Sequence, residues 1–173
     1  MGSGGMIVMD DRTGMVDVAK YFLGFLKLES CGKCTTCREG IKRLYELVDD
    51  ITKGKGTEEH IKAIEDLSDT VEAASLCALG TTAMNPVRST LKLFRDEYIA
   101  HVRDHKCPAA VCKELITFTI DPDACTGCLV CKKRCPQDAI IGKKKEPHSI
   151  IQEKCIQCGI CEDVCKFDSV RVQ

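Results

Sequence analysis

The sequence lacks tryptophan, and aromatic residues make up only 5% of its 173 residues. So few large apolar side chains favour small helical units or metal-stabilised modules over one deep core. The sequence also lacks any apolar run near the roughly 18 residues that a membrane-spanning helix needs. A formal net charge of −1 gives no strong positive field to attract nucleic acid. These absences predict a globular chain without membrane or nucleic-acid partners.

The N-terminus has no basic region followed by an apolar stretch, so no secretory signal is predicted. We therefore expect a cytoplasmic protein. What the chain has in excess is cysteine, with 14 residues. In a reducing compartment, so many cysteines indicate metal binding more often than disulfides. The spacing of the cysteines decides between the two.

The first large segment, residues 12–102, has apolar residues at intervals of three and four, which indicates amphipathic helices. Four such stripes occur, at Val16–Leu26, Ile41–Ile51, Ile61–Val71 and Val87–Tyr98. Thr57 followed by two glutamates is typical of a helix start, and so is Asn85-Pro86. The pattern predicts a four-helix bundle whose core is formed by the stripes.

The last segment, residues 116–173, has a different pattern. Alternation over Ile116–Ile120 predicts a short strand. A repeat with an offset of 30 residues follows, which aligns Cys125, Cys128, Cys131 and Cys135 with Cys155, Cys158, Cys161 and Cys165. Each half is predicted to hold a strand, a cysteine loop, a short helix and a second strand. The fold class expected for the whole chain is therefore multi-domain α+β.

Each half of the repeat has the spacing Cys-x2-Cys-x2-Cys-x3-Cys that is typical of bacterial ferredoxins with two [4Fe–4S] clusters. Three cysteines at this spacing can hold three corners of one cluster, while a short helix carries the fourth to the other cluster. One cluster is therefore predicted to use Cys125, Cys128, Cys131 and Cys165, and the other Cys155, Cys158, Cys161 and Cys135. Zinc sites or disulfides would explain neither the third cysteine of each loop nor the repeat.

Residues 117–173 thus resemble the two-[4Fe–4S] ferredoxins, with one departure. Lys166 stands where that family usually has proline. The lysine restores a backbone N–H and adds a positive charge, and both are expected to raise the reduction potential of the nearby cluster.

A third cysteine set lies in the helical segment. Cys31, Cys34 and Cys37 are three residues apart at the start of the second predicted helix, and Cys77 lies between the third and the fourth. An antiparallel bundle can return Cys77 to the loop. Backbone N–H groups at a helix start favour a negatively charged cluster. From the spacing alone, a zinc site remains an alternative to a third [4Fe–4S] cluster.

The segment Ser-Cys-Gly-Lys-Cys-x-x-Cys-Arg-Glu-Gly at 30–40 carries a further resemblance. Residues 5–79 are similar to the C-terminal domain of the NADH-oxidising flavoprotein subunit of respiratory complex I. The resemblance implies that this segment and Cys77 bind a [4Fe–4S] cluster that receives electrons from FMN. Residues 2–10 resemble the chain of that family just before the bundle, and residues 1–11 are expected to be a remnant of the preceding flavoprotein domain.

A ferredoxin unit behind such a bundle is similar to the beta subunit of soluble NAD-linked [FeFe]-hydrogenases, including electron-bifurcating ones. The resemblance implies FMN and NAD in a preceding domain, because this chain has no glycine-rich nucleotide loop of its own. It implies other hydrogenase subunits and soluble ferredoxin as partners, and an electron carrier without its own active site. NAD-linked formate dehydrogenases and complex I-like enzymes are alternatives. A structural or interaction module held together by zinc is an alternative of another class.

Two cysteines belong to no cluster set. Cys107 and Cys112 lie in the expected linker, residues 103–115, close to His101 and His105. Histidines four residues apart share one helix face, so these four side chains are predicted to form a zinc site. A disulfide, free thiols and exposed histidines are the alternatives. His60 and His148 are predicted to be surface residues, because each stands in a polar run.

Overall fold

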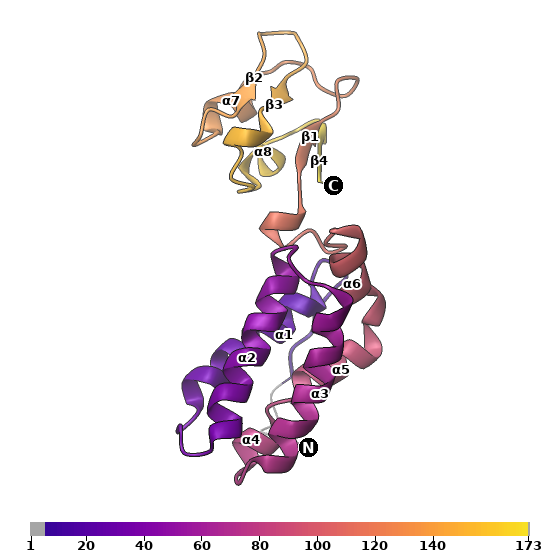
Figure 1. The fold of residues 1–173 in the computed structure, drawn as a ribbon. Helices are drawn as coiled ribbons and strands as arrows, with labels where there is room; N and C mark the ends of the chain where they lie inside the picture. Colours follow the sequence, from indigo (N-terminus) through magenta and orange to yellow (C-terminus); the bar gives the residue numbers. More distant parts are fainter. Residues whose placement is uncertain (1–5, 173) are drawn as a thin grey trace. The chain divides into compact units, whose positions relative to one another are not determined.

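The computed structural model describes residues 6–172, which fold as two compact units. The helical unit ends at Leu115, and the ferredoxin-like unit begins at Ile116 (Figure 1). Residues 103–115, expected as a linker, are part of the helical unit. No helix within residues 6–172 is both long enough and apolar enough to cross a membrane.

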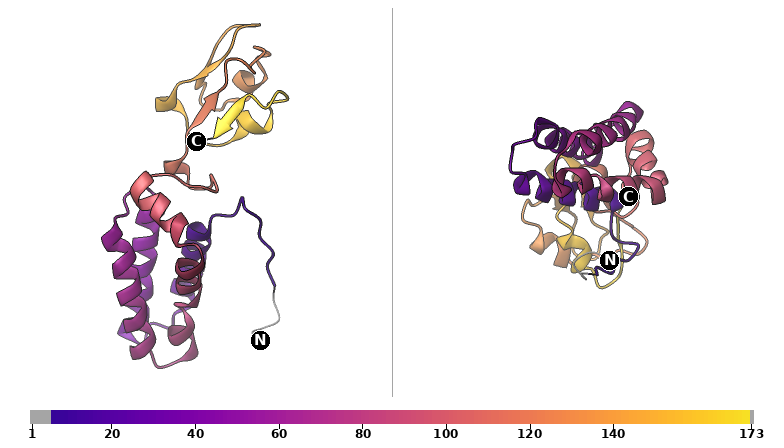
Figure 2. Two further views of the ribbon diagram at one scale, coloured as in Figure 1. Left: turned by 90° about the vertical axis from the view of Figure 1, so that its right-hand side faces the viewer. Right: turned by 90° about the horizontal axis from the view of Figure 1, so that it is seen from below.

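The helical unit contains three long helices followed by shorter pieces. Its elements are α1 (Met15–Glu29), α2 (Thr35–Thr52), α3 (Glu58–Ala74), α4 (Ala78–Thr82), α5 (Asn85–Leu93), α6 (Arg95–Ile99), a π-helical turn (Ala100–Asp104) and a 3-10 turn (Lys113–Leu115). Helix α2 packs between α1 and α3, and α1 also contacts α5 (Figure 2). The sequence predicts neither the short α4 nor the break between α5 and α6.

Some helix starts are stabilised by neighbouring residues, and others by residues far away in the sequence. The predicted start at Thr57 is confirmed, and the Thr57 N–H donates to Nδ1 of His60 at 3.2 Å. The start of α1 is stabilised from α6, because the N–H groups of Met15 and Val16 donate to the Glu97 carboxylate at 3.1 and 3.2 Å. Since Glu97 is 81 residues away from Val16, the unit must close before α1 is fully capped.

The fourth predicted helix is interrupted at Phe94, which has φ −129° and ψ 37° and is 43% exposed. Phe94 lies within the stripe Val87–Tyr98 that is predicted to form the core, and for this residue the prediction is wrong. The break turns α6 so that Tyr98 is fully buried, with its hydroxyl 2.8 Å from Oγ1 of Thr90. A buried phenol needs such a partner, so the interruption satisfies a polar group inside the core.

Helices α2 and α3 approach each other closely at Gly40. A Cβ atom built on Gly40 would lie 2.2 Å from Cγ2 of Val71. Gly40→Ala is therefore expected to lower the free energy of unfolding by about 2 kcal/mol, although alanine is the better helix former. In the Val71→Ala background the same substitution should be neutral or stabilising. Thermal unfolding followed by far-ultraviolet circular dichroism gives both values, and equal costs in the two backgrounds would contradict the contact.

The ferredoxin-like unit confirms the predicted order of strand, cysteine loop, short helix and strand in each half. Its elements are β1 (Phe118–Ile120), α7 (Val130–Arg134), β2 (Ile140–Ile141), β3 (Ser149–Ile150), a 3-10 turn (Gln152–Lys154), α8 (Ile160–Asp163) and β4 (Val170–Val172). Strand β1 pairs antiparallel with β4, and β2 with β3. The strand that opens each half thus pairs with the strand that closes the other half.

The backbone repeats with the same offset as the cysteines. Positive φ angles occur at the equivalent pairs Gly127 and Gln157, Leu129 and Gly159, and Asp138 and Asp168. A left-handed conformation is unfavourable for residues other than glycine, by about 1–2 kcal/mol. The unit nevertheless keeps it at Leu129 and Gln157, so the two cysteine loops have one shape despite their different residues.

Candidate metal centres

Two cavities in the ferredoxin-like unit are lined by four cysteines each. Cavity A is lined by Cys125, Cys128, Cys131 and Cys165, and cavity B by Cys155, Cys158, Cys161 and Cys135. In each case three cysteines come from one loop and the fourth from the other half of the repeat. The crossed strand pairing explains this, because β1, which precedes the first loop, pairs with β4, which follows Cys165.

Burial affects the cavity thiols. It raises the pKa of Cys131, and it raises the pKa of Cys161 to about 11. At Cys165 burial acts in the same direction, but hydrogen bonds from the Ser169 hydroxyl and from backbone N–H groups outweigh it and lower the pKa. A metal that binds a thiol displaces its proton, even where burial raises the pKa of the thiol. Four converging thiols therefore suit an iron–sulfur cluster.

Backbone and side-chain groups from beyond the loops also reach the cavity sulfurs. In cavity A the N–H of His148 donates to Sγ of Cys125 at 3.5 Å, and Nδ1 of His148 lies 3.6 Å from the same sulfur. The Ser169 hydroxyl lies 3.1 Å from Sγ of Cys165. In cavity B the N–H of Ala139 donates to Sγ of Cys135 at 3.3 Å. Such contacts orient cluster ligands and adjust cluster potentials.

The prediction that His148 is a surface residue is wrong, because its side chain is only 3% exposed. The ring packs against Gly142, where a Cβ atom would lie 2.6 Å from Cδ2 of His148. The polar run hides this contact, although the repeat aligns His148 with the apolar Phe118 and could have indicated burial. Lys166 is exposed, so water screens the charge that was expected to act on a cluster.

The third cysteine set lies where α2 begins. Cys34 is the N-cap residue of α2, Cys37 is buried in its first turn, and Cys31 is exposed in the loop before it. The loop is closed by the Arg38 guanidinium, which donates to the Gly32 carbonyl. Gly32 has a φ of +76°, a conformation that glycine adopts without strain.

Cys77 belongs to the same end of the helical unit, where α4 lies in Figure 1. A Cβ atom built on Gly80 would lie 3.4 Å from Cβ of Cys37, and the Thr36 hydroxyl donates to the Ala74 carbonyl at 3.0 Å. The turn from α3 to α4 therefore lies against the start of α2. The N–H groups of Gly80 and Leu79 lower the pKa of Cys77, as expected for an N-cap thiol.

The end of the helical unit that holds Cys77 also contains a buried polar atom without a hydrogen-bond partner in the described part of the chain. Oγ of Ser75 is buried and has no hydrogen-bond partner within residues 6–172. A buried hydroxyl without a partner costs about 1–3 kcal/mol. A cluster on the neighbouring cysteines would offer acceptor sulfurs, so the orphaned hydroxyl fits the predicted group.

The remaining two cysteines meet a histidine. The ligand atoms of His101, Cys107 and Cys112 all lie within 4.8 Å of one another, and all three residues are buried. His105, the fourth predicted member, is not among them. The helix ends in a π-helical turn at Asp104, and His105 follows with a φ of 50° and an exposed side chain. The spacing argument for His105 fails because the regular helix does not extend that far.

The three side chains are arranged as metal ligands usually are. Nδ1 of His101 donates to the Glu97 carbonyl at 2.8 Å, which leaves Nε2 facing Sγ of Cys112 at 3.4 Å. A hydrogen bond from Cys112 lowers the pKa of Cys107 to about 3 and raises that of Cys112. The two thiols are not joined in a disulfide. One imidazole and two cysteine sulfurs suit zinc.

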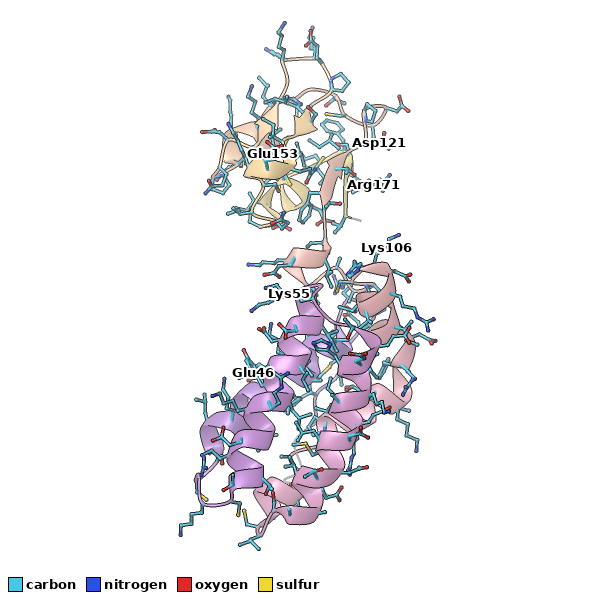
Figure 3. All side chains as sticks on the ribbon, in the orientation of Figure 1. Glu46, Lys55, Lys106, Asp121, Glu153 and Arg171 are labelled. Atoms are coloured by element: carbon cyan, nitrogen blue, oxygen red, sulfur yellow. The ribbon has the colours of Figure 1, made fainter. Side chains whose placement is uncertain are left out.

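The two centres of the helical unit lie at opposite ends. Lys55, which follows α2, and Lys106, which precedes Cys107, are at one end, and α4 is at the other (Figures 1 and 3). The set of His101, Cys107 and Cys112 therefore cannot complete the set that contains Cys77.

Comparison with known proteins identifies both parts of the chain. Residues 17–101 match the family described as the NADH-ubiquinone oxidoreductase-F iron-sulfur binding region, and residues 117–166 match the 4Fe-4S dicluster domain. The NADP-reducing hydrogenase subunit HndC of Solidesulfovibrio fructosivorans is 55% identical over 170 residues, which is 98% of this chain and 35% of the relative. The helical part of the chain is thus similar to F-type subunits, and its last part to dicluster ferredoxin domains.

Two further matches cover a smaller share of the chain. The F subunit of the NADH-quinone oxidoreductase of Mycobacterium bovis is 42% identical over 108 residues, which is 62% of this chain and 24% of the relative. A crystal structure of an NAD+-reducing [NiFe]-hydrogenase in the H2-reduced state has a TM-score of 0.54 and 31% identity over 56% of this chain and 17% of that one. The chain thus spans about a third or less of the relatives' length.

The two family regions contain the three cysteine sets that the sequence predicts as cluster ligands. The F-type region includes Cys31, Cys34, Cys37 and Cys77, and the dicluster region includes the eight cysteines of cavities A and B. This F-subunit-like chain is therefore an iron–sulfur electron-transfer module. Cys107 and Cys112 lie between the two matched regions.

Proposed function

We propose that the chain holds three [4Fe–4S] clusters and relays electrons among them as part of an NAD-linked hydrogenase. One cluster would be held by Cys31, Cys34, Cys37 and Cys77, the second in cavity A and the third in cavity B. A [4Fe–4S] cluster supplies a site that accepts or gives one electron. The chain would contribute the placement of these sites and their surroundings.

A hydrogenase is favoured over a complex I-like enzyme by the extent of the similarity. The hydrogenase relative HndC matches 98% of the chain, including the ferredoxin-like unit, whereas the mycobacterial relative matches 62%. We propose that electrons enter at the helical unit from FMN, reduced by NADH on another part of the protein, and that they leave to other hydrogenase subunits and soluble ferredoxin. Electron bifurcation and a cytoplasmic location are part of the proposal.

The observation that supports the clusters most directly is the composition of cavities A and B. Each cavity gathers four thiols, three from one loop and one from the other half of the repeat. Apolar side chains line most of the rest of cavity B, including Ile140 and Ile150, and part of cavity A, including Val130 and Val164. These side chains would exclude water from a cluster, while backbone N–H groups donate to the ligand sulfurs.

The test is the metal and sulfide content of protein prepared without oxygen. We expect the iron and acid-labile sulfide of three [4Fe–4S] clusters per chain, visible absorption that dithionite bleaches, and the electron paramagnetic resonance (EPR) signals of reduced clusters. A colourless protein that holds zinc at all cysteine sets, and that dithionite does not reduce, would instead support the structural or interaction module.

We propose zinc as the fourth metal group, held by His101, Cys107 and Cys112. Zinc usually takes four ligands, so one position is left for a water molecule or for a side chain from outside residues 6–172. The Glu97 carbonyl fixes the orientation of the imidazole by accepting a hydrogen bond from the Nδ1–H of His101. Zinc here would tie residues 107–112 to the end of α6 and stabilise the helical unit.

A further inference from the structure

The repeat places different side chains at equivalent positions around cavities A and B. An offset of 30 residues aligns His148 with Phe118 and Ser169 with Ala139. His148 and Ser169 line cavity A, whereas Phe118 and Ala139 line cavity B. The two cavities are therefore alike in their cysteines and differ in the residues beside them.

The proton positions in cavity A follow from the chemistry of a bound cysteine. A cysteine that ligates iron is a thiolate and can only accept hydrogen bonds. The 3.6 Å contact between Nδ1 of His148 and Sγ of Cys125 must then be an Nδ1–H donor on sulfur. For the same reason, the Ser169 hydroxyl donates to Sγ of Cys165 at 3.1 Å.

Both donors are held in place by the fold. The His148 ring is buried against Gly142, whose carbonyl accepts a hydrogen bond from Nζ of Lys132 at 2.9 Å. Ser169 is 3% exposed, and its carbonyl accepts the N–H of Asp121 at 2.7 Å. Donors fixed in this way act on the cluster without reorganising when its charge changes.

Cavity B has no counterpart of these two side-chain donors. The Phe118 ring and the Ala139 methyl group have no polar hydrogen, and both residues are buried. The Ala139 N–H does donate to Sγ of Cys135, and backbone N–H groups likewise act on Cys165. Backbone donors are therefore present at both crossing cysteines. Cavity A has in addition the backbone N–H of His148 on Cys125 and the side-chain donors of His148 and Ser169.

We propose that His148 and Ser169 raise the reduction potential of the cluster in cavity A above that of the cluster in cavity B. Reduction adds one electron and one negative charge, breaks no bond, and strengthens every hydrogen bond that points at the cluster sulfurs. An electron shared by the unit would then rest in cavity A. The inference depends on the proposed cluster ligands. His148 and Ser169 are positioning residues.

The experiment exchanges the side chains between the two halves. The double variant His148→Phe/Ser169→Ala gives cavity A the residues of cavity B, and Phe118→His/Ala139→Ser does the reverse. Each is reduced stepwise without oxygen in the presence of redox mediators, and the clusters are followed by EPR. The expected result is that the first variant lowers the higher of the two potentials, and the second raises the lower.

The expected size is about a tenfold change in the ratio of reduced to oxidised cluster at a fixed potential, or about 59 mV for one electron. Ser169→Ala and His148→Gln serve as milder variants if a larger one does not fold. The alanine variant should lower the same potential by a smaller amount, and glutamine, which keeps a donor, should lower it less than phenylalanine does.

Iron and sulfide analysis of every variant separates the role of His148 and Ser169 from the proposed function of the chain. Three clusters per chain with unchanged potentials in the folded variants would overturn the role of His148 and Ser169 and leave the proposed function intact. Wild-type protein without three clusters would instead overturn the proposed function.

Discussion

Replacing Cys135 with alanine is expected to remove the cluster in cavity B, although Cys135 follows the loop that serves cavity A. The physical reason is geometric, because α7 carries Cys135 away from its own loop to line the cavity of Cys155, Cys158 and Cys161. The variant should lose the iron and sulfide of one cluster per chain. Cys165→Ala should likewise lose one cluster, the one in cavity A.

Double variants show which cluster each cysteine serves. Cys135→Ala/Cys155→Ala should lose no more iron than either single variant, because both residues line cavity B. Cys135→Ala/Cys125→Ala should lose two clusters, because Cys125 lines cavity A. The opposite pattern, with one cluster lost in the second pair and two in the first, would show that each loop serves its own fourth cysteine.

Replacing His101 with alanine is expected to abolish stoichiometric zinc binding and to lower the midpoint of thermal unfolding of the helical unit by roughly 10 °C. The substitution removes one of three converging ligands and leaves the buried sulfurs of Cys107 and Cys112 without their partner. Zinc content of the purified protein and thermal unfolding with and without a chelator measure the two effects.

His105→Ala is the matched control for this experiment. His105 is a histidine four residues away in the same segment, but it is exposed and lies outside the ligand group. This variant should keep its zinc and its midpoint, and removal of a left-handed histidine should change stability only slightly. Loss of zinc in the His105 variant together with its retention in the His101 variant would reverse the assignment.

Together, these results would describe a chain in which three cysteine sets and one mixed set have separate tasks. The helical unit has the cysteine loop at one end and the His101 set at the other, so loss of the proposed cluster is expected to leave the proposed zinc in place. The ferredoxin-like unit ties its two cavities together, because every cavity needs residues from both halves. Damage to one half is therefore expected to affect both clusters when it disturbs the strand pairing.

The sequence alone determined the features that depend on short distances along the chain. The cysteine spacings and the 30-residue repeat predicted the two loops and their crossed fourth cysteines, and the structure brings those residues to common cavities. The helix start at Thr57 and the order of elements in each repeat were also predictable. Each of these is set by local backbone preference or by the reach of a few residues.

Only the tertiary structure decided the features that depend on packing between distant residues. The break in the helix at Phe94 accompanies the burial of Tyr98 against Thr90, and no pattern in the neighbouring residues predicts this break. His105 leaves the metal group because the helix ends in a π-helical turn, whereas His148 enters cavity A because Gly142 makes room for its ring. The helical spacing placed His105 wrongly and the polar run placed His148 wrongly, because burial depends on what the rest of the fold packs against a side chain.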